Sequence, residues 1–232
     1  ERQMGTNFAS LILSGAEAEK VAKSKNAYKS LRKLYENPTK DKKYALLIAD
    51  LILSEEENPE KEIEAVVAEK GAIVRSLIEL LRSDDFHDPL MPGYGKAPLL
   101  AAKCLGQIGD KRAIISLFEA LGEEDFFDED IELAALKAIG EPAKEFLLHV
   151  VRGRPLNIDN ERAAIGLIQF KEDLKVAEVA FQMLQENDVQ QNIPLATYLI
   201  MACENINKTA YKDEFIKMAK DKNLNNMLKL DI

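Results

Sequence analysis

Hydrophobic residues recur at helical spacing along most of this 232-residue chain, and short breaks separate the helical stretches. In AAKCLGQIGDKRAIISLFEAL (residues 101–121), apolar positions three and four residues apart form one stripe. The pair Gly109-Asp110 then interrupts the stripe, and a second one follows. This spacing predicts amphipathic helices, and the break predicts a tight turn between them. We therefore expect a helical hairpin here.

The hairpin pattern recurs at an offset of 31 residues, so that Leu105 corresponds to Leu136 and then to Leu167. The second helices also correspond, with one-residue slips, and they span residues 113–121, 143–151 and 176–184. Residues 73–81 match the same element at an offset of 40, because an inserted connection precedes Ala97. A short helix pair cannot cover its own apolar stripe, and stacking against the next pair buries that stripe. The predicted fold class is all-α, an α-solenoid of about six stacked antiparallel helix pairs.

We expect a single domain whose first and last helix pairs are atypical, because end pairs cap the array. Further helical stripes lie near both ends of the chain, at residues 16–36 and 44–52 and at residues 193–203 and 211–218. The predicted division is N-terminal capping helices at 1–58, repeats at 59–186 and a C-terminal capping pair at 187–232.

The turn residues carry local predictions. Gly109 and Gly140 suit the left-handed position that ends a helix, because glycine has no side chain to clash there. Asp110 suits the N-cap of the following helix. Lys171 stands at the equivalent position of the next repeat. Lysine adopts the left-handed conformation only at a cost, so we expect that third turn to differ.

Residues 101–121 resemble the HEAT-like repeat first associated with phycobilin lyases, and residues 131–151 and 163–184 resemble it without its Gly-Asp-x-Arg part. The small, apolar and Gly-Asp-x-Arg positions of that family fall on Ala101, Ala102, Leu105, Gly106, Ile108, Gly109, Asp110 and Arg112. The resemblance implies a HEAT-type solenoid that binds another protein. The history of the family leaves an alternative open, a bilin (tetrapyrrole) lyase or lyase subunit.

Charge is unevenly distributed in this chain, whose formal net charge is -9. Residues 16–43 hold nine basic and four acidic residues, whereas residues 123–132 hold seven acids and no base. A net acidic chain repels nucleic acid, so we expect none as a partner; binding through the basic N-terminal helix remains the second alternative. No apolar run reaches the ~20 residues needed to span a bilayer, and we expect a cytoplasmic protein. The chain begins at Glu1, which leaves open whether a segment precedes it.

Candidate chemistry is sparse. Cys104 and Cys203 lie in apolar helical runs without a CxxC spacing, so we expect buried thiols and no zinc site. His87 lies among Asp84, Asp85 and Asp88, where turn and capping roles are expected and a metal site is the alternative. GYGKAP (residues 93–98) lacks the spacing and the preceding strand of a phosphate loop. We therefore predict no catalytic, cofactor-binding or metal-binding residues, and no cofactor.

The repeat alignment predicts a concave face on the second helices, with mixed charge that suits a protein or peptide better than a phosphate backbone. An acidic edge at EEDFFDED (residues 123–130) is a second candidate, where an aromatic ringed by acids would anchor a basic, apolar peptide. The function expected is a non-catalytic protein–protein interaction scaffold. Its candidate partner-binding residues are Arg75, Glu79, Arg112, Ile115, Glu119, Glu145, His149, Glu178, Gln182, Phe126 and Phe127.

The connection between residues 84 and 96 is longer than usual for helix pairs and contains two Pro, two Gly and three Asp. We expect it to be the most mobile internal connection of the chain.

Overall fold

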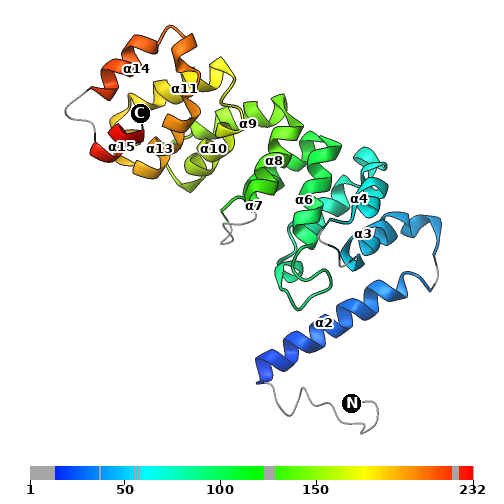
Figure 1. Ribbon diagram of the computed structural model, residues 1–232. Coiled ribbons are helices and arrows are strands. Elements are labelled where there is room, and N and C mark those ends of the chain that lie inside the picture. Colours follow the sequence, from blue (N-terminus) through cyan, green and yellow to red (C-terminus); the bar gives the residue numbers. More distant parts are fainter. Residues whose placement is uncertain are drawn as a thin grey trace. The chain divides into compact units, whose positions relative to one another are not determined.

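The computed structural model describes residues 14–36, 38–54, 56, 58–122, 129–220 and 225–231. Within these residues every regular element is a helix, and 14 of them are α-helices (Figure 1). The predicted all-α class is therefore confirmed, while the solenoid arrangement stays a prediction. The chain divides into two compact units, an N-terminal unit that ends at Ser116 and a C-terminal unit that begins at Leu117. The boundary falls inside one of the predicted repeats.

Helix α6 forms the centre of the N-terminal unit and packs against α3, α4 and α5. Its buried residues include Ala101, Ala102 and Leu105, each fully inaccessible to solvent, as the repeat pattern predicts. The small alanine side chains permit close approach of neighbouring helices. The α-helices here are α2 (Gly15–Lys33), α3 (Lys43–Leu53), α4 (Glu60–Val67), α5 (Val74–Leu81), α6 (Ala97–Ile108) and α7 (Ile114–Ala120), which crosses into the next unit. Short 3-10 turns are η1 (Lys40–Lys42), η2 (Lys70–Ala72), η3 (Asp84–His87) and η4 (Lys111–Ala113).

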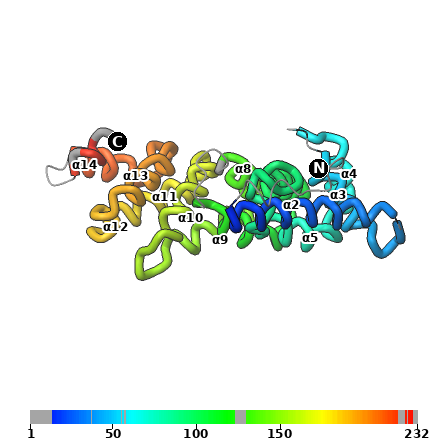
Figure 2. Tube along the Cα trace, turned by 90° about the horizontal axis from the view of Figure 1, so that it is seen from below, coloured from blue at the N-terminus to red at the C-terminus, as the bar shows by residue number. Residues whose placement is uncertain are grey.

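Helix α2 differs from the other helices of its unit, and Figures 1 and 2 show it as one long uninterrupted coil. It begins with a capping box, in which Ser14 and Glu17 each accept a hydrogen bond from the backbone N–H of the other. Only Ser24 is buried along its 19 residues. The helix therefore depends more on its own capping and on polar contacts than on an apolar face.

The C-terminal unit is closely packed around α10 and α13, which contact each other. Helix α10 also packs on α9, and Gly166 of α10 faces Leu147 of α9 so closely that an added Cβ would lie 3.0 Å from the leucine methyl carbons. The ring of Phe181 in α11 packs at a tilt against the Tyr211 ring and edge-on against the Phe215 ring. The helices are α8 (Glu129–Ile139), α9 (Glu141–Val151), α10 (Ile158–Ile168), α11 (Leu174–Leu184), α12 (Asn187–Gln191), α13 (Ile193–Ala202), η5 (Ile206–Lys208), α14 (Lys212–Ala219) and α15 (Asn226–Asp231).

The turns agree with the sequence in two cases and differ in one. Gly109 ends α6 in the left-handed conformation, with φ 70° and ψ 22°, and Asp110 caps the next turn by accepting a hydrogen bond from the Arg112 N–H. Gly140 also has a positive φ of 79°, but its ψ of -133° lies outside the left-handed helical region, so its expected conformation was wrong. Glycine alone reaches that region easily, because a Cβ would clash. Lys171 avoids a positive φ, so the third turn differs as expected.

Candidate functional site

Four predicted partner-binding residues lie in the N-terminal unit, and we call them the α5–α7 face: Arg75, Glu79, Arg112 and Ile115. Helix α5 packs against η4, the turn that leads into α7. Ile115 is 54% exposed and is one of several large apolar residues that face solvent. Arg75 and Glu79 form an exposed ion pair one helical turn apart, with 3.0 Å between Nε and Oε1. The predicted face thus includes one exposed apolar residue and one exposed ion pair on neighbouring elements.

Arg112 has a role within the chain that the repeat alignment did not show. Its Nε and Nη2 donate hydrogen bonds to the Asp110 carboxylate at 3.0 and 2.7 Å, and Nη2 also donates to the Gly71 carbonyl at 2.6 Å. The guanidinium group therefore joins η2, which contains Gly71, to the Asp110 cap of η4. These hydrogen bonds from Arg112 hold the pKa of Asp110 below its ordinary value. Much of the donor capacity of Arg112 is used internally.

The corresponding residues of the C-terminal unit are Glu145, His149, Glu178 and Gln182, and we call them the α9–α11 face. Glu145 accepts a hydrogen bond from Lys175 Nζ at 2.6 Å, which links α9 to α11. Gln182 donates to the Tyr211 hydroxyl at 3.2 Å, and His149 is exposed. Glu178 is only half-exposed. Glu119, on α7, is exposed as well.

A buried lysine beside this face was missed by the sequence analysis. The side chain of Lys144 is 8% exposed, and its ammonium group forms ion pairs with Asp173 and, at 2.7 Å, with Glu141. The hydrogen bond from Lys144 is the main cause that lowers the pKa of Asp173, and the same bond raises the pKa of Lys144. The other repeats have apolar residues at the position of Lys144. The sequence does not reveal the partner of this lysine, because Asp173 lies 29 positions away.

The acidic edge falls mostly outside the described residues. Phe126, Phe127 and the acids from Glu123 to Asp128 belong to that part of the chain, so their predicted role stays a prediction. Helix α8 begins at Glu129, inside the acidic run, as expected for acids that favour the helix dipole.

The segment between residues 84 and 96, for which mobility is predicted, is folded against the helices of its unit. Met91, Pro92 and Gly93 are buried, and Asp85 and Asp88 form ion pairs with Lys23 and Lys20 of α2. These lysines supply partners that the local sequence does not reveal, and the mobility of the segment stays a prediction. His87 is exposed, and nowhere in the described ranges do three His, Cys, Asp or Glu side chains come together as metal ligands would.

Both cysteines are buried, as predicted. Burial raises the pKa of the Cys104 and Cys203 thiols to about 12. Thiols in such surroundings stay protonated and unreactive near neutral pH.

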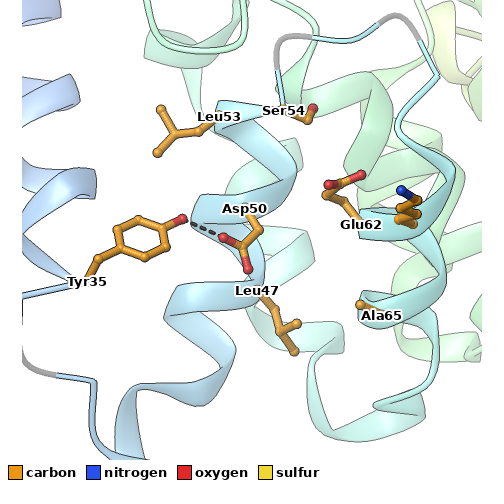
Figure 3. Close-up of a pocket in the computed structure, with 8 residues that line it drawn as sticks. Tyr35, Leu47, Asp50, Leu53, Ser54, Glu62 and Ala65 are labelled. Carbon is orange, nitrogen blue, oxygen red and sulfur yellow. Dashed lines mark hydrogen bonds between the residues drawn. The ribbon is translucent and has the colours of Figure 1, made fainter.

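A pocket of about 330 Å³ opens between the end of α2 and helices α3 and α4, and we call it the Tyr35 pocket (Figure 3). Its polar groups include the Tyr35 hydroxyl and the carboxylates of Asp50 and Glu62, and Leu47 and Leu53 supply apolar surface. The Tyr35 hydroxyl donates a hydrogen bond to Asp50 Oδ1 at 2.6 Å. This pocket was not predicted from the sequence, because its lining comes from three separate elements. The local signal that the sequence does offer is the acidic run after α3.

Comparisons with protein-family models, curated proteins and solved structures found no match for this chain. Among the described residues, no helix has the length and apolar character to cross a membrane.

Proposed function

We propose that this chain is a non-catalytic protein-binding module, built as a HEAT-like α-solenoid, whose solvent-facing second helices hold a protein partner. The observation that carries the proposal is the α5–α7 face. Ile115 is 54% exposed on α7, and Arg75 and Glu79 form an exposed ion pair on α5, the helix that packs against the η4 turn leading into α7. An apolar anchor surrounded by charged residues is typical of the energetically important centre of a protein interface.

The charges of the two faces support a protein partner over a polyanion. The α5–α7 face carries two arginines and one glutamate, and the α9–α11 face carries two glutamates, one of which binds Lys175, so neither face holds a continuous basic row. A nucleic-acid interface would need a continuous basic row. The raised pKa of both buried thiols also disfavours a cysteine nucleophile, which agrees with a binding role.

Site-specific photocrosslinking tests this proposal. A photoreactive amino acid replaces Ile115 in one sample and Leu90 in another, because Leu90 belongs to the same unit and is 52% exposed. Irradiation in an extract of the native cells, followed by mass spectrometry, should identify a protein that crosslinks through position 115 and not through position 90. The purified partner is then titrated with Ile115→Glu and with the matched control Leu90→Glu. We expect Ile115→Glu to weaken binding by at least about tenfold, as loss of an interface anchor does.

Two results would refute the proposal. One is equal crosslinking through positions 115 and 90, which would mean that proteins of the extract collide with the chain at random. The other is a partner whose affinity is unchanged by Ile115→Glu, which would place its binding site elsewhere.

A further inference from the structure

The Tyr35 pocket brings together acidic groups from two facing helices. Asp50 projects from α3 and Glu62 from α4, and the Tyr35 ring approaches Asp50 from the side of α2 (Figure 3). Glu62 is half-buried, and within the described part of the chain its carboxylate has no hydrogen-bond or ion-pair partner. A cation that lies between carboxylates on two facing helices can form charge-assisted hydrogen bonds with both of them.

Tyr35 orients one of these carboxylates. Burial, and then the hydrogen bond to Asp50, raises the pKa of the Tyr35 hydroxyl well above its ordinary value of 10.0, so it remains a donor at neutral pH. Its bond to Oδ1 at 2.6 Å leaves Oδ2 of Asp50 available to a ligand.

The chain that supplies the pocket is acidic in sequence, and the pocket lining itself holds two carboxylates and one ammonium group. Residues 50–64 contain seven acids and a single basic residue, Lys61, which also lines the pocket. Lys61 is exposed on α4, and its flexible stem can keep the ammonium group in water. The local charge therefore favours a cationic occupant.

The apolar part of the lining favours a cation that is carried on a hydrocarbon stem. Leu47, Leu53 and Ala65 offer surface for a short hydrocarbon stem. A planar guanidinium group has five N–H donors in a fixed fork, so it can reach carboxylates on two different helices at once, which an ammonium group does less well. The Tyr35 ring adds an aromatic face on which a guanidinium group stacks well.

We propose that the Tyr35 pocket binds an arginine side chain from a basic segment of a partner protein. Asp50 and Glu62 accept hydrogen bonds from the guanidinium group, and the leucines contact its methylene stem. This inference rests on the proposed function for the source of the arginine, and it deepens that function by giving the partner a recognisable chemical feature.

The test uses the full ¹⁵N-labelled chain and two small probes, N-acetyl-arginine N-methylamide and its neutral isostere, the citrulline analogue. We expect the arginine probe to shift the amide signals of Asp50, Glu62 and Ala65, and the citrulline probe to leave them unchanged. Asp50→Asn combined with Glu62→Gln should weaken arginine binding by about tenfold or more, the usual effect of losing hydrogen bonds to charged groups. Asparagine can still accept the Tyr35 hydrogen bond, so the local structure is preserved.

The matched control is Glu60→Gln combined with Glu64→Gln, which removes the same charge from exposed positions of α4 outside the pocket. It should change the affinity by less than about twofold at physiological salt, because exposed charges are screened. Equal weakening in both double variants would show diffuse attraction and overturn the proposal, as would equal binding of the citrulline probe or no shift at the pocket. The probes need no partner, so loss of crosslinking at Ile115 would refute the proposed function alone.

Discussion

In each unit a basic residue links two chain segments that lie far apart in sequence, but the two residues differ in burial. In the N-terminal unit Arg112 lies 56% exposed and joins Asp110 to the Gly71 carbonyl. In the C-terminal unit Lys144 is almost fully buried between Asp173 and Glu141. An exposed pair contributes little to stability, because water competes for both charges, whereas a buried lysine depends on its partners. Similar turns therefore differ in how strongly they rely on one ion pair.

Charge separates the units as well. Residues 1–116 contain 18 basic and 18 acidic residues, whereas residues 117–232 contain 13 basic and 22 acidic residues, which accounts for the whole net charge. The balanced unit nevertheless holds segments of opposite charge, a basic α2 and the acidic residues 50–64 around the Tyr35 pocket. Local grouping of charge, rather than the total, therefore decides which ligands each surface attracts.

The largest effect should come from the core positions that the two units share. Leu105→Ala in α6 and Leu167→Ala in α10 each truncate a fully buried leucine, and each should lower the free energy of unfolding by about 2–5 kcal/mol. Chemical denaturation measures the loss, and hydrogen exchange shows which unit loses protection. A loss below about 0.5 kcal/mol for either variant would contradict the shared repeat register.

A smaller and unequal effect should distinguish the two basic residues. Lys144→Met removes the main ion-pair partner of Asp173 and places a thioether beside its carboxylate. We expect the free energy of unfolding to fall by about 1–3 kcal/mol, and no more, because Asp173 keeps some contact with water. Arg112→Met, an exposed counterpart of similar length, should cost no more than about 1 kcal/mol. Equal losses of unfolding free energy for the two variants, measured by thermal or urea unfolding, would show that burial does not make Lys144 more important to stability than Arg112.

The pH dependence of the same pair of variants sharpens this difference. Lys144 holds the pKa of Asp173 below its ordinary value of 3.8, so the stabilisation is complete above that value and is lost as pH falls through the lowered pKa. The pKa of Lys144 is raised above 10.5, so its contribution persists at alkaline pH and is lost only as pH rises through the raised value. The stability gap between wild type and Lys144→Met should thus be constant near neutrality and narrow in strong acid. A gap that widens in acid would contradict this sign.

The smallest effect should come from the contacts that hold α2 to the segment between residues 84 and 96. Lys20 and Lys23 are 64% and 60% exposed, so Lys20→Ser with Lys23→Ser should cost less than about 1 kcal/mol. Limited proteolysis should nevertheless cut that segment faster in the double variant than in wild type, and high salt should reproduce part of the change. Wild-type cleavage there before any other described connection would confirm that the segment is mobile, as its sequence predicts.

Sequence periodicity alone was enough to locate the main helices and the buried positions Leu105, Leu136 and Leu167, because an apolar stripe requires only local spacing. It also placed the Gly109 turn and the Asp110 cap, which depend on adjacent residues. Tertiary structure decided the rest. Lys144 meets Asp173, Lys23 meets Asp85 and Tyr35 meets Asp50 across 29, 62 and 15 positions of chain. Such contacts depend on how helices pack in three dimensions, and residue spacing within one helix carries no information about them.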